Sequence, residues 1–457
     1  MLIDPVPPVA PEGIFSRRLR AMTVGSVALI SLLAFEALAV GTAMPTVARS
    51  LDGLALYALA FGGSFASGVL AMVLSGIWCD VRGPRGPMWH GVAWFVAGLL
   101  IAGTAPVMSL LVVGRFVQGF GSGLLMVALY VIVGRVYPES THRRVFAAFA
   151  AAWVVPSLVG PALAGLVVEH LGWRWVFLAV PAVAVPAVLL VNPGLRSVGA
   201  PDGGRAPRDA VARIGWACGA AASAALLHYG GQQRGPLAVG LVVAALVGLL
   251  VCAPRLLPAG FLRAGRGLPT VVGLRGLASA AFVGAEVVIP LLLSRERGLS
   301  PTAAGIALTV GAVSWSLGSW LQGRLPEPRS RATLPRVGML CIGTGVAVFA
   351  LALWPAVPVP VAVLGWSLSG LGMGLTYPTL SVLTLELSAS GEQGRNSSSL
   401  QLSDALFAAT VLASTGALLA GGPDPTAYLT ALAVSAGLAL LGSTLAGRVV
   451  VPAVPAR

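Results

Sequence analysis

Charged side chains inside long apolar segments are the residues of this 457-residue chain best suited to chemistry. Five of them lie away from the ends of these segments: Glu36, Arg115, Arg275, Glu286 and Asp404. A charge inside an apolar segment is costly, so it usually faces a partner or a cavity and serves a function. A carboxylate in such a place can bind and release a proton, whereas an arginine stays charged and pairs with it. These residue types indicate ion pairing and proton transfer.

The composition indicates which environment surrounds these charges. The chain is 57% hydrophobic and 10% charged, with a mean hydropathy of +0.89. Soluble domains carry about 25% charged residues, so a soluble enzyme and a disordered chain are both excluded. The net charge of +13 comes from 29 arginines without a lysine, which lie between apolar segments rather than on one face. No cluster of histidines, cysteines or carboxylates has catalytic or metal-ligand spacing, so we expect neither an enzyme nor a metal or cofactor site.

Fourteen apolar segments are long enough to cross a bilayer and are arranged as six, two and six. They are 22–47, 54–78, 87–106, 108–134, 145–169, 173–192, 213–229, 236–254, 268–293, 301–323, 335–354, 358–385, 398–421 and 427–447. The pair at 213–254 is short, and without it the count is twelve spans, which is the alternative. The predicted fold is therefore an all-α integral membrane protein. Its predicted parts are a tail at 1–21, a six-helix bundle at 22–192, linkers with the extra pair at 193–267, a second six-helix bundle at 268–447 and a tail at 448–457.

The arginines predict how the chain is oriented. With the N-terminus inside, 22 arginines lie on the cytoplasmic side, five lie outside and two lie within spans. This excess follows the positive-inside rule. We therefore expect a multi-pass protein of the cell (inner or plasma) membrane with both termini in the cytoplasm. The expected partners are the lipid bilayer and a small-molecule substrate, without nucleic acid, and the chain is expected to be monomeric.

Two pairs of opposite charge are predicted at matching depths. Glu36 and Arg115 fall in the outer half of the bilayer, and Gln118 lies one turn from Arg115 on the same helix face. We expect a Glu36–Arg115 pair that protonation or substrate breaks and remakes. The alternatives are an arginine that extends outward to the interface and a simple interhelical hydrogen bond from Glu36. An Arg275–Asp404 bridge in the inner third would serve either as a structural lock or in transport.

Further candidates lie in the second half and among the aromatic residues. Glu286 precedes Pro290 in the ninth span. Aromatic residues in the fifth and twelfth spans could line a cavity, although single aromatics at helical spacing more often pack in a core. The residues predicted for proton coupling are Glu36, Arg115, Glu286 and Asp404, and those predicted for substrate binding are Glu36, Gln118, Trp153, Trp366 and Tyr377.

An internal repeat supports the arrangement of six plus six. The fourth span contains QGFGSGL at 118–124, and the twelfth contains SGLGMGL at 369–375. Glycines at this spacing permit close packing of helices. Duplicated bundles related by an axis along the membrane normal are a transporter architecture in which the substrate binds between the halves.

The loop after the second span carries the first family signature. Residues 76–85 read GIWCDVRGPR, which places one carboxylate and two guanidinium groups at the membrane face. This resembles the signature loop G-x-L-x-D-R-x-G-R-K of the major facilitator superfamily, from which it departs at Val81 and Pro84. The resemblance implies that Asp80 bridges the two bundles near a helix N-terminus, where partial positive charge favours an anion. The matching hydroxyls are those of Ser397, Ser398 and Ser399, and the alternative is an ordinary solvated turn.

Four more features resemble motifs of this superfamily. LVVGRFVQG at 111–119 is similar to L-x-x-x-R-x-x-Q-G, and GPALAG at 160–165 is similar to the antiporter motif G-P-x-x-G-G. WRWVF at 173–177 and Glu36 before Pro45 resemble features of the fourteen-span drug:proton antiporters. A Gly-Pro pair can also be a simple kink. The residues that the resemblance assigns to conformational gating, with the bridge arginine, are Gly76, Asp80, Arg82, Gly83, Arg85, Gly160, Pro161 and Arg275.

The resemblance implies a fold and a function. The fold would be the major facilitator fold, with two six-helix bundles related by a pseudo-two-fold axis and an extra helix pair between them. The function would be proton-coupled secondary transport, with the proton as coupling ion and no cofactor. We expect an antiporter that exports drugs or other amphipathic small molecules by alternating access. A dedicated metabolite exporter and a proton-coupled importer of a small solute remain the alternatives.

Overall fold

The computed structural model describes residues 13–195, 208–231, 233, 235–325, 330–419 and 424–450. Within these ranges the chain is built from helices, most of them long and apolar. The α-helices are α1 (Arg20–Ser50), α2 (Tyr57–Arg82), α3 (Arg85–Thr104), α4 (Met108–Val136), α5 (His142–His170), α6 (Arg174–Leu178), α7 (Pro181–Leu195), α8 (Ala210–Gly230), α9 (Pro236–Leu256), α10 (Leu268–Arg295), α11 (Pro301–Arg324), α12 (Ser330–Ala350), α13 (Val359–Glu386), α14 (Gln393–Leu419) and α15 (Pro425–Leu445).

Fourteen helical spans in the described chain are long and apolar enough to cross a membrane. They include the pair α8–α9, so the count is fourteen and not twelve. The sixth span is broken into α6 and α7 just before Pro181, which lacks the backbone N–H that would continue the first helix. Most boundaries differ from the prediction by up to four residues; for example, α1 begins at Arg20 and α7 reaches Leu195. The largest shifts are of five residues: α12 begins at Ser330 rather than at residue 335, and α14 begins at Gln393 rather than at residue 398. The predicted tails at 1–12 and 451–457, most of the linker at 196–207 and the end of the thirteenth span at 420–421 lie outside the described residues.

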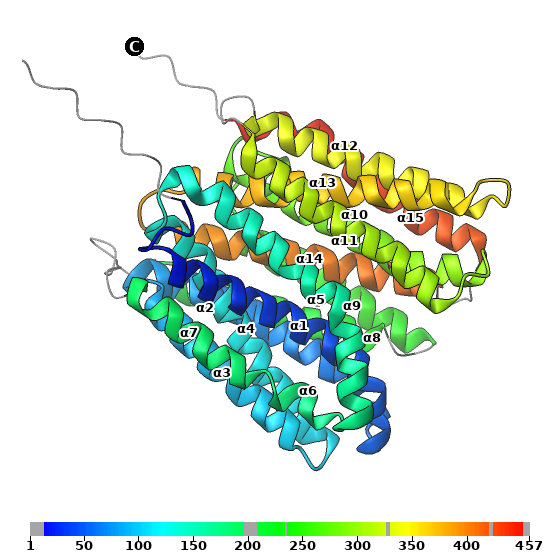
Figure 1. Cartoon of the computed structure of the whole chain (residues 1–457), viewed down its shortest axis with the longest axis horizontal. Coiled ribbons are helices and arrows are strands. Elements are labelled where there is room, and N and C mark those ends of the chain that lie inside the picture. Colours follow the sequence, from blue (N-terminus) through cyan, green and yellow to red (C-terminus); the bar gives the residue numbers. More distant parts are fainter. Residues whose placement is uncertain are drawn as a thin grey trace, which may run out of the picture.

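The helices form two bundles, α1–α7 and α10–α15, that lie side by side (Figure 1). The two bundles approach each other at the end where α1 begins and α15 ends, which we call the terminal end. Away from this end their helices diverge (Figure 1). The pair α8–α9 lies beside the bundles, with α8 packed along α2.

The repeated glycines explain why the two bundles have the same internal packing. In α4 the glycines of the repeat approach the backbones of α2 and α3 so closely that a Cβ atom would overlap them. In α13 the equivalent glycines approach the backbones of α11 and α12 in the same way. Such contacts let helix backbones come close without side chains between them. The contacts are Gly119–Ser64, Gly121–Phe95 and Gly123–Gly68 in the first bundle, and Gly370–Gly311, Gly372–Gly338 and Gly374–Trp315 in the second.

Candidate functional site

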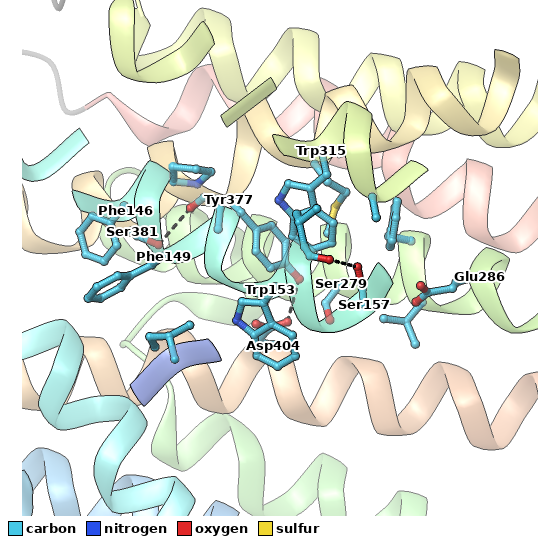
Figure 2. A pocket seen from close by; sticks show the side chains of 18 of the residues that line it. Phe146, Phe149, Trp153, Ser157, Ser279, Glu286, Trp315, Tyr377, Ser381 and Asp404 are labelled. Atoms are coloured by element: carbon cyan, nitrogen blue, oxygen red, sulfur yellow. Dashed lines mark hydrogen bonds between the residues drawn. The ribbon is translucent and has the colours of Figure 1, made fainter. Parts of the chain in front are cut away.

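A cavity of about 330 Å³ lies between the two bundles, within the size range of small-molecule sites. The first bundle contributes side chains of α1, α4 and α5 to its wall, and the second bundle contributes α10, α11, α13 and α14. Of the five residues predicted to bind substrate, Trp153, Trp366 and Tyr377 line this cavity. Figure 2 shows the cavity with Trp153, Tyr377 and Trp315 around it and Glu286 at one side.

A polar cluster of Arg275, Asp404 and Tyr377 forms part of the cavity wall. Arg275 Nε and Nη2 each lie 3.0 Å from Asp404 Oδ2, so the predicted bridge between α10 and α14 is present. The hydroxyl of Tyr377 donates to Asp404 Oδ1 at 2.8 Å, and the Arg275 guanidinium lies over the Tyr377 ring at 3.6 Å. The Arg275 side chain is 4% exposed and that of Asp404 is 23% exposed, so the carboxylate is the member that solvent or substrate reaches.

Glu286 is a carboxylate in the cavity wall without an ion-pair or hydrogen-bond partner among the described residues. It lies on α10, eleven positions after Arg275, which corresponds to about 16 Å along the helix. The part of the cavity farther from the terminal end therefore carries an unpaired carboxylate, while the carboxylate of Asp404, nearer that end, is held by Arg275. An unpaired carboxylate at membrane depth can bind a proton or a cationic group of a ligand.

Aromatic side chains fill the space between these polar groups. Phe282 stacks on Trp366 with ring centroids 4.4 Å apart, and Trp315 meets both Phe282 and Tyr377 edge to face at 5.2 and 5.3 Å. Across the cavity, Phe146, Phe149 and Trp153 come from α5. Of the aromatic lining residues, Tyr130, Phe146, Phe149, Phe282 and Trp315 were missed in the sequence, because aromatic residues on a buried helix face look the same whether they line a cavity or a core.

The second predicted pair, Glu36 with Arg115, is formed inside the first bundle. Arg115 Nη1 donates to both Glu36 Oε1 and Gln118 Oε1, and its Nε donates to the carbonyl of Ala60 at 3.3 Å. The Arg115 and Glu36 side chains are 6% and 8% exposed. None of Glu36, Arg115 and Gln118 is among the residues that line the cavity. Their predicted roles in coupling and substrate binding are therefore not supported by a position in the cavity wall.

The gate, which we define as Asp80 and the first turn of α14, joins the bundles at the terminal end. Asp80 accepts hydrogen bonds from the backbone N–H groups of Gly394 and Arg395, both at 2.7 Å. The predicted bridge to a helix N-terminus is present, but the predicted partners, the hydroxyls of Ser397–Ser399, are wrong. The helix begins five residues earlier than expected, so its free N–H groups precede these serines.

The remaining residues of the signature loop shape the turn beside the gate. Gly76 lies against the backbone of Gly394, where a Cβ atom would leave too little space. Gly83 ends α2 with a φ of 83°, a conformation that glycine adopts without strain. Arg82 and Arg85 are exposed at the surface.

Two arginines that were not singled out in the sequence also join the bundles at the terminal end. Arg135 of α4 donates to the carbonyl of Cys79 at 3.1 Å and to Gln393 at 3.4 Å. Arg143 of α5 donates to the carbonyl of Leu325 at the end of α11, at 2.8 Å. Both connections to the second bundle lie at the terminal end, like those of Asp80. Gly160 and Pro161 lie farther along α5, where Gly160 faces Phe35 and Leu38 of α1.

Two helical bundles with the same glycine packing, an aromatic cavity between them and hydrogen bonds that join them at one end are the architecture of a membrane transporter. The chain belongs to the major facilitator superfamily, whose family model matches residues 24–411.

Two curated relatives are named as drug transporters. A probable multidrug-efflux transporter of Mycobacterium tuberculosis is 28% identical over 75% of this chain and 75% of its own length. The multidrug transporter protein MdtP of Bacillus subtilis is 26% identical over 85% of this chain and 73% of its own length.

Solved structures show the same fold at low sequence identity. The human organic anion transporter MFSD10 aligns with a TM-score of 0.69 at 16% identity, over 94% of this chain and 99% of its own. A bacterial homologue of the iron transporter ferroportin, in an outward-facing state, aligns with a TM-score of 0.68 at 16% identity, over 94% and 98%. The proton:xylose symporter XylE aligns with a TM-score of 0.63 at 16% identity, over 93% and 94%.

Proposed function

We propose that this protein is a proton-coupled antiporter that exports amphipathic small molecules. The observation that carries this function is the cavity between the bundles, where an aromatic wall lies beside carboxylates at two depths. Aromatic and apolar surface binds the apolar part of many different molecules, while a carboxylate adds a site for one proton or one positive charge. The names of the two curated relatives support the choice of drug-like substrates.

The gate supports a transport cycle of alternating access. The bundles are joined by hydrogen bonds at the terminal end and diverge away from it (Figure 1). With the termini in the cytoplasm, as the arginines predict, this arrangement faces outward. Return to the inward-facing state requires that Asp80 release the N-terminus of α14.

Protons would couple to this cycle at carboxylates within the spans. Asp404 connects α10 to α14, and α14 also carries the amides of the gate, so protonation of Asp404 would weaken a contact of the same helix. Glu286 is available to a proton or a cationic substrate because no arginine neutralises it. Glu36 differs from both, because its carboxylate accepts a hydrogen bond from Arg115 inside the first bundle.

The function is tested by transport into proteoliposomes with an imposed pH gradient, over a panel of cationic, neutral and anionic amphiphiles. We expect transport of amphiphiles against the direction of proton flow and loss of this transport when an uncoupler collapses the gradient. Transport that persists without the gradient would exclude proton coupling. Movement of substrate and protons in the same direction would identify an importer.

The three carboxylates are then compared in the same assay. Glu286→Gln and Asp404→Asn should each reduce gradient-driven transport at least about tenfold, because each removes a titratable group from the cavity wall. Glu36→Gln tests the carboxylate outside the cavity. Full proton-coupled transport by Glu36→Gln would exclude the Glu36–Arg115 pair as the coupling element. Exchange of unlabelled for labelled substrate without a gradient provides the control that each variant still binds and turns over.

A further inference from the structure

The carbonyl at the end of α9 is shared by two helices of different parts of the molecule. Leu256 O accepts a hydrogen bond from Arg213 Nη2 of α8 at 3.2 Å and another from Ser399 Oγ of α14 at 3.1 Å. Arg213, Leu256 and Ser399 are 5%, 1% and 3% exposed. A carbonyl in the last turn of a helix has no partner within the helix, so both of its lone pairs are free for these donors.

The pair α8–α9 is attached to the first bundle through α8, which packs along α2. Gly62 of α2 lies directly against His228 of α8, and Phe65 meets the His228 ring with centroids 5.5 Å apart. Ser399 belongs to α14 of the second bundle. The hydrogen bond from Ser399 to Leu256 therefore connects the pair to the other bundle.

This connection lies beside the gate. Arg213 is close enough to Asp80 and Arg395 for their charges to act on its guanidinium group. Ser398, the neighbour of Ser399, lies against Gly76 in the close contact between α2 and α14. The first turns of α14 are thus held by Asp80 from one side and by the end of α9 from another.

Arg213 is placed for this contact at a cost to its own hydrogen bonding. Its Nε is buried and has no hydrogen-bond partner among the described residues. A buried donor without a partner is unfavourable, so the position of the side chain is set by the other contacts it makes. One of these contacts is the hydrogen bond from Arg213 to the Leu256 carbonyl. It holds this carbonyl in the position where it also accepts from Ser399.

We propose that the extra pair α8–α9 is a latch on the closed gate, in which Arg213 positions the Leu256 carbonyl and this carbonyl holds Ser399 of α14. When α14 leaves α2, the Ser399–Leu256 bond must break together with the two bonds of Asp80. The latch goes beyond the proposed function, because it acts on the conformational equilibrium whatever the substrate and the coupling ion are.

Cys79 provides a built-in reporter of gate opening. It is fully buried, precedes Asp80 and lies against Gly394, so opening of the gate exposes its thiol. The experiment uses the full chain in lipid nanodiscs with the other cysteines replaced (Cys218→Ser, Cys252→Ala, Cys341→Ala). The rate at which N-ethylmaleimide alkylates Cys79 is followed by mass spectrometry, and it is proportional to the open fraction when opening is fast.

Removal of either donor should favour the open gate. We expect Ser399→Ala and Arg213→Gln each to raise the alkylation rate about three- to tenfold, the effect of losing one hydrogen bond. The double variant should match the single variants within about twofold, because both donors act through one carbonyl. Ser398→Ala is the matched control, since its hydroxyl is buried without a hydrogen-bond partner among the described residues, and it should leave the rate unchanged.

A second reporter separates a latch from general loosening of the protein. Ser157→Cys, in a background with Cys79→Ala as well, places a thiol in the wall of the cavity between the bundles. Alkylation of this cavity thiol should fall or stay constant in Arg213→Gln and Ser399→Ala. In alternating access, opening of the gate at the terminal end closes the cavity at the other end. A rise at both reporters would overturn the latch, and so would a wild-type rate at Cys79 in both variants or multiplied effects in the double variant.

Discussion

The two bundles use the same backbone packing but place their buried ion pairs differently. In the first bundle, Arg115 and Glu36 are both less than a tenth exposed and lie outside the cavity wall. In the second bundle, Arg275 is equally buried, but Asp404 is 23% exposed and lies in the wall. The two halves of the repeat therefore share the glycines that position the helices. They differ in where the buried charges lie. The polar chemistry at the cavity belongs to the second bundle, and the first contributes mainly aromatic surface from α5.

The largest expected effect concerns what the bundles share. Gly121→Val and Gly372→Val should each abolish the yield of folded protein, because the new side chain would overlap the backbone of Phe95 or Gly338. The yield is measured by size-exclusion chromatography of a fluorescent fusion. Gly165→Ala and Gly437→Ala, in the two bundles, are the controls, since no atom lies within 4 Å of the added group. Normal yields of both valine variants would show that the close approach is not required.

The next prediction separates the two ion pairs. Arg115→Met leaves Glu36 buried without a partner and should reduce the free energy of unfolding by about 3–5 kcal/mol. Arg275→Met leaves a carboxylate that water in the cavity can solvate, so it should be less destabilising while transport is lost. Unfolding in detergent and transport in proteoliposomes give the two readouts.

Restoration of stability in the double variant Glu36→Gln/Arg115→Met would support this explanation. The opposite result would be that Arg275→Met is as destabilising as Arg115→Met, while the fraction of the variant that folds still transports substrate. The bridge between Arg275 and Asp404 would then be a structural lock.

The smallest expected effects come from the third member of each cluster. Tyr377→Phe removes the hydroxyl that donates to Asp404, and Gln118→Leu removes the amide oxygen that accepts from Arg115. A hydrogen bond to a charged group contributes about 1.5–3 kcal/mol. We expect Tyr377→Phe to raise the KM for substrate and shift the pH profile of transport, and Gln118→Leu to reduce stability with the pH profile unchanged. The same response of both variants would remove the distinction between the bundles.

The number of spans, their grouping and both ion pairs could be predicted from the sequence because each depends on local patterns. Apolar length defines a span, and charges at equal depth on neighbouring helices meet. The start of α14 could not be predicted, because Gln393–Asn396 is polar and reads as a loop, although it is the first turn of a helix in contact with α2. Because the start of α14 was predicted too late, the serines after residue 396 were predicted as the partners of Asp80. The actual partners are the backbone N–H groups of Gly394 and Arg395.

The composition of the cavity could be predicted only in part. Trp153, Trp366 and Tyr377 were found because they lie near the motifs, whereas Trp315 and Phe282 lie on helix faces without one. Whether a face lines a cavity depends on the angle between two bundles, and a single sequence carries no local signal for that angle. The same holds for Glu36, which shares the depth of a cavity residue but points to Arg115 within its own bundle.

The contact between α10 and α14 divides α14 into two unequal arms. Ser403 of α14 donates a hydrogen bond to the carbonyl of Val272 of α10 and lies directly against Gly276. The two helices are therefore in close contact at Ser403. Gly394 lies about 13 Å from this point along the axis, and Leu419 lies about 24 Å from it on the other side. If α14 turns as a rigid rod about this fulcrum, a small displacement at the Asp80 end produces nearly twice that displacement at the far end. Breaking a few hydrogen bonds at the Asp80 end would thus produce a larger movement between the two bundles at the opposite end.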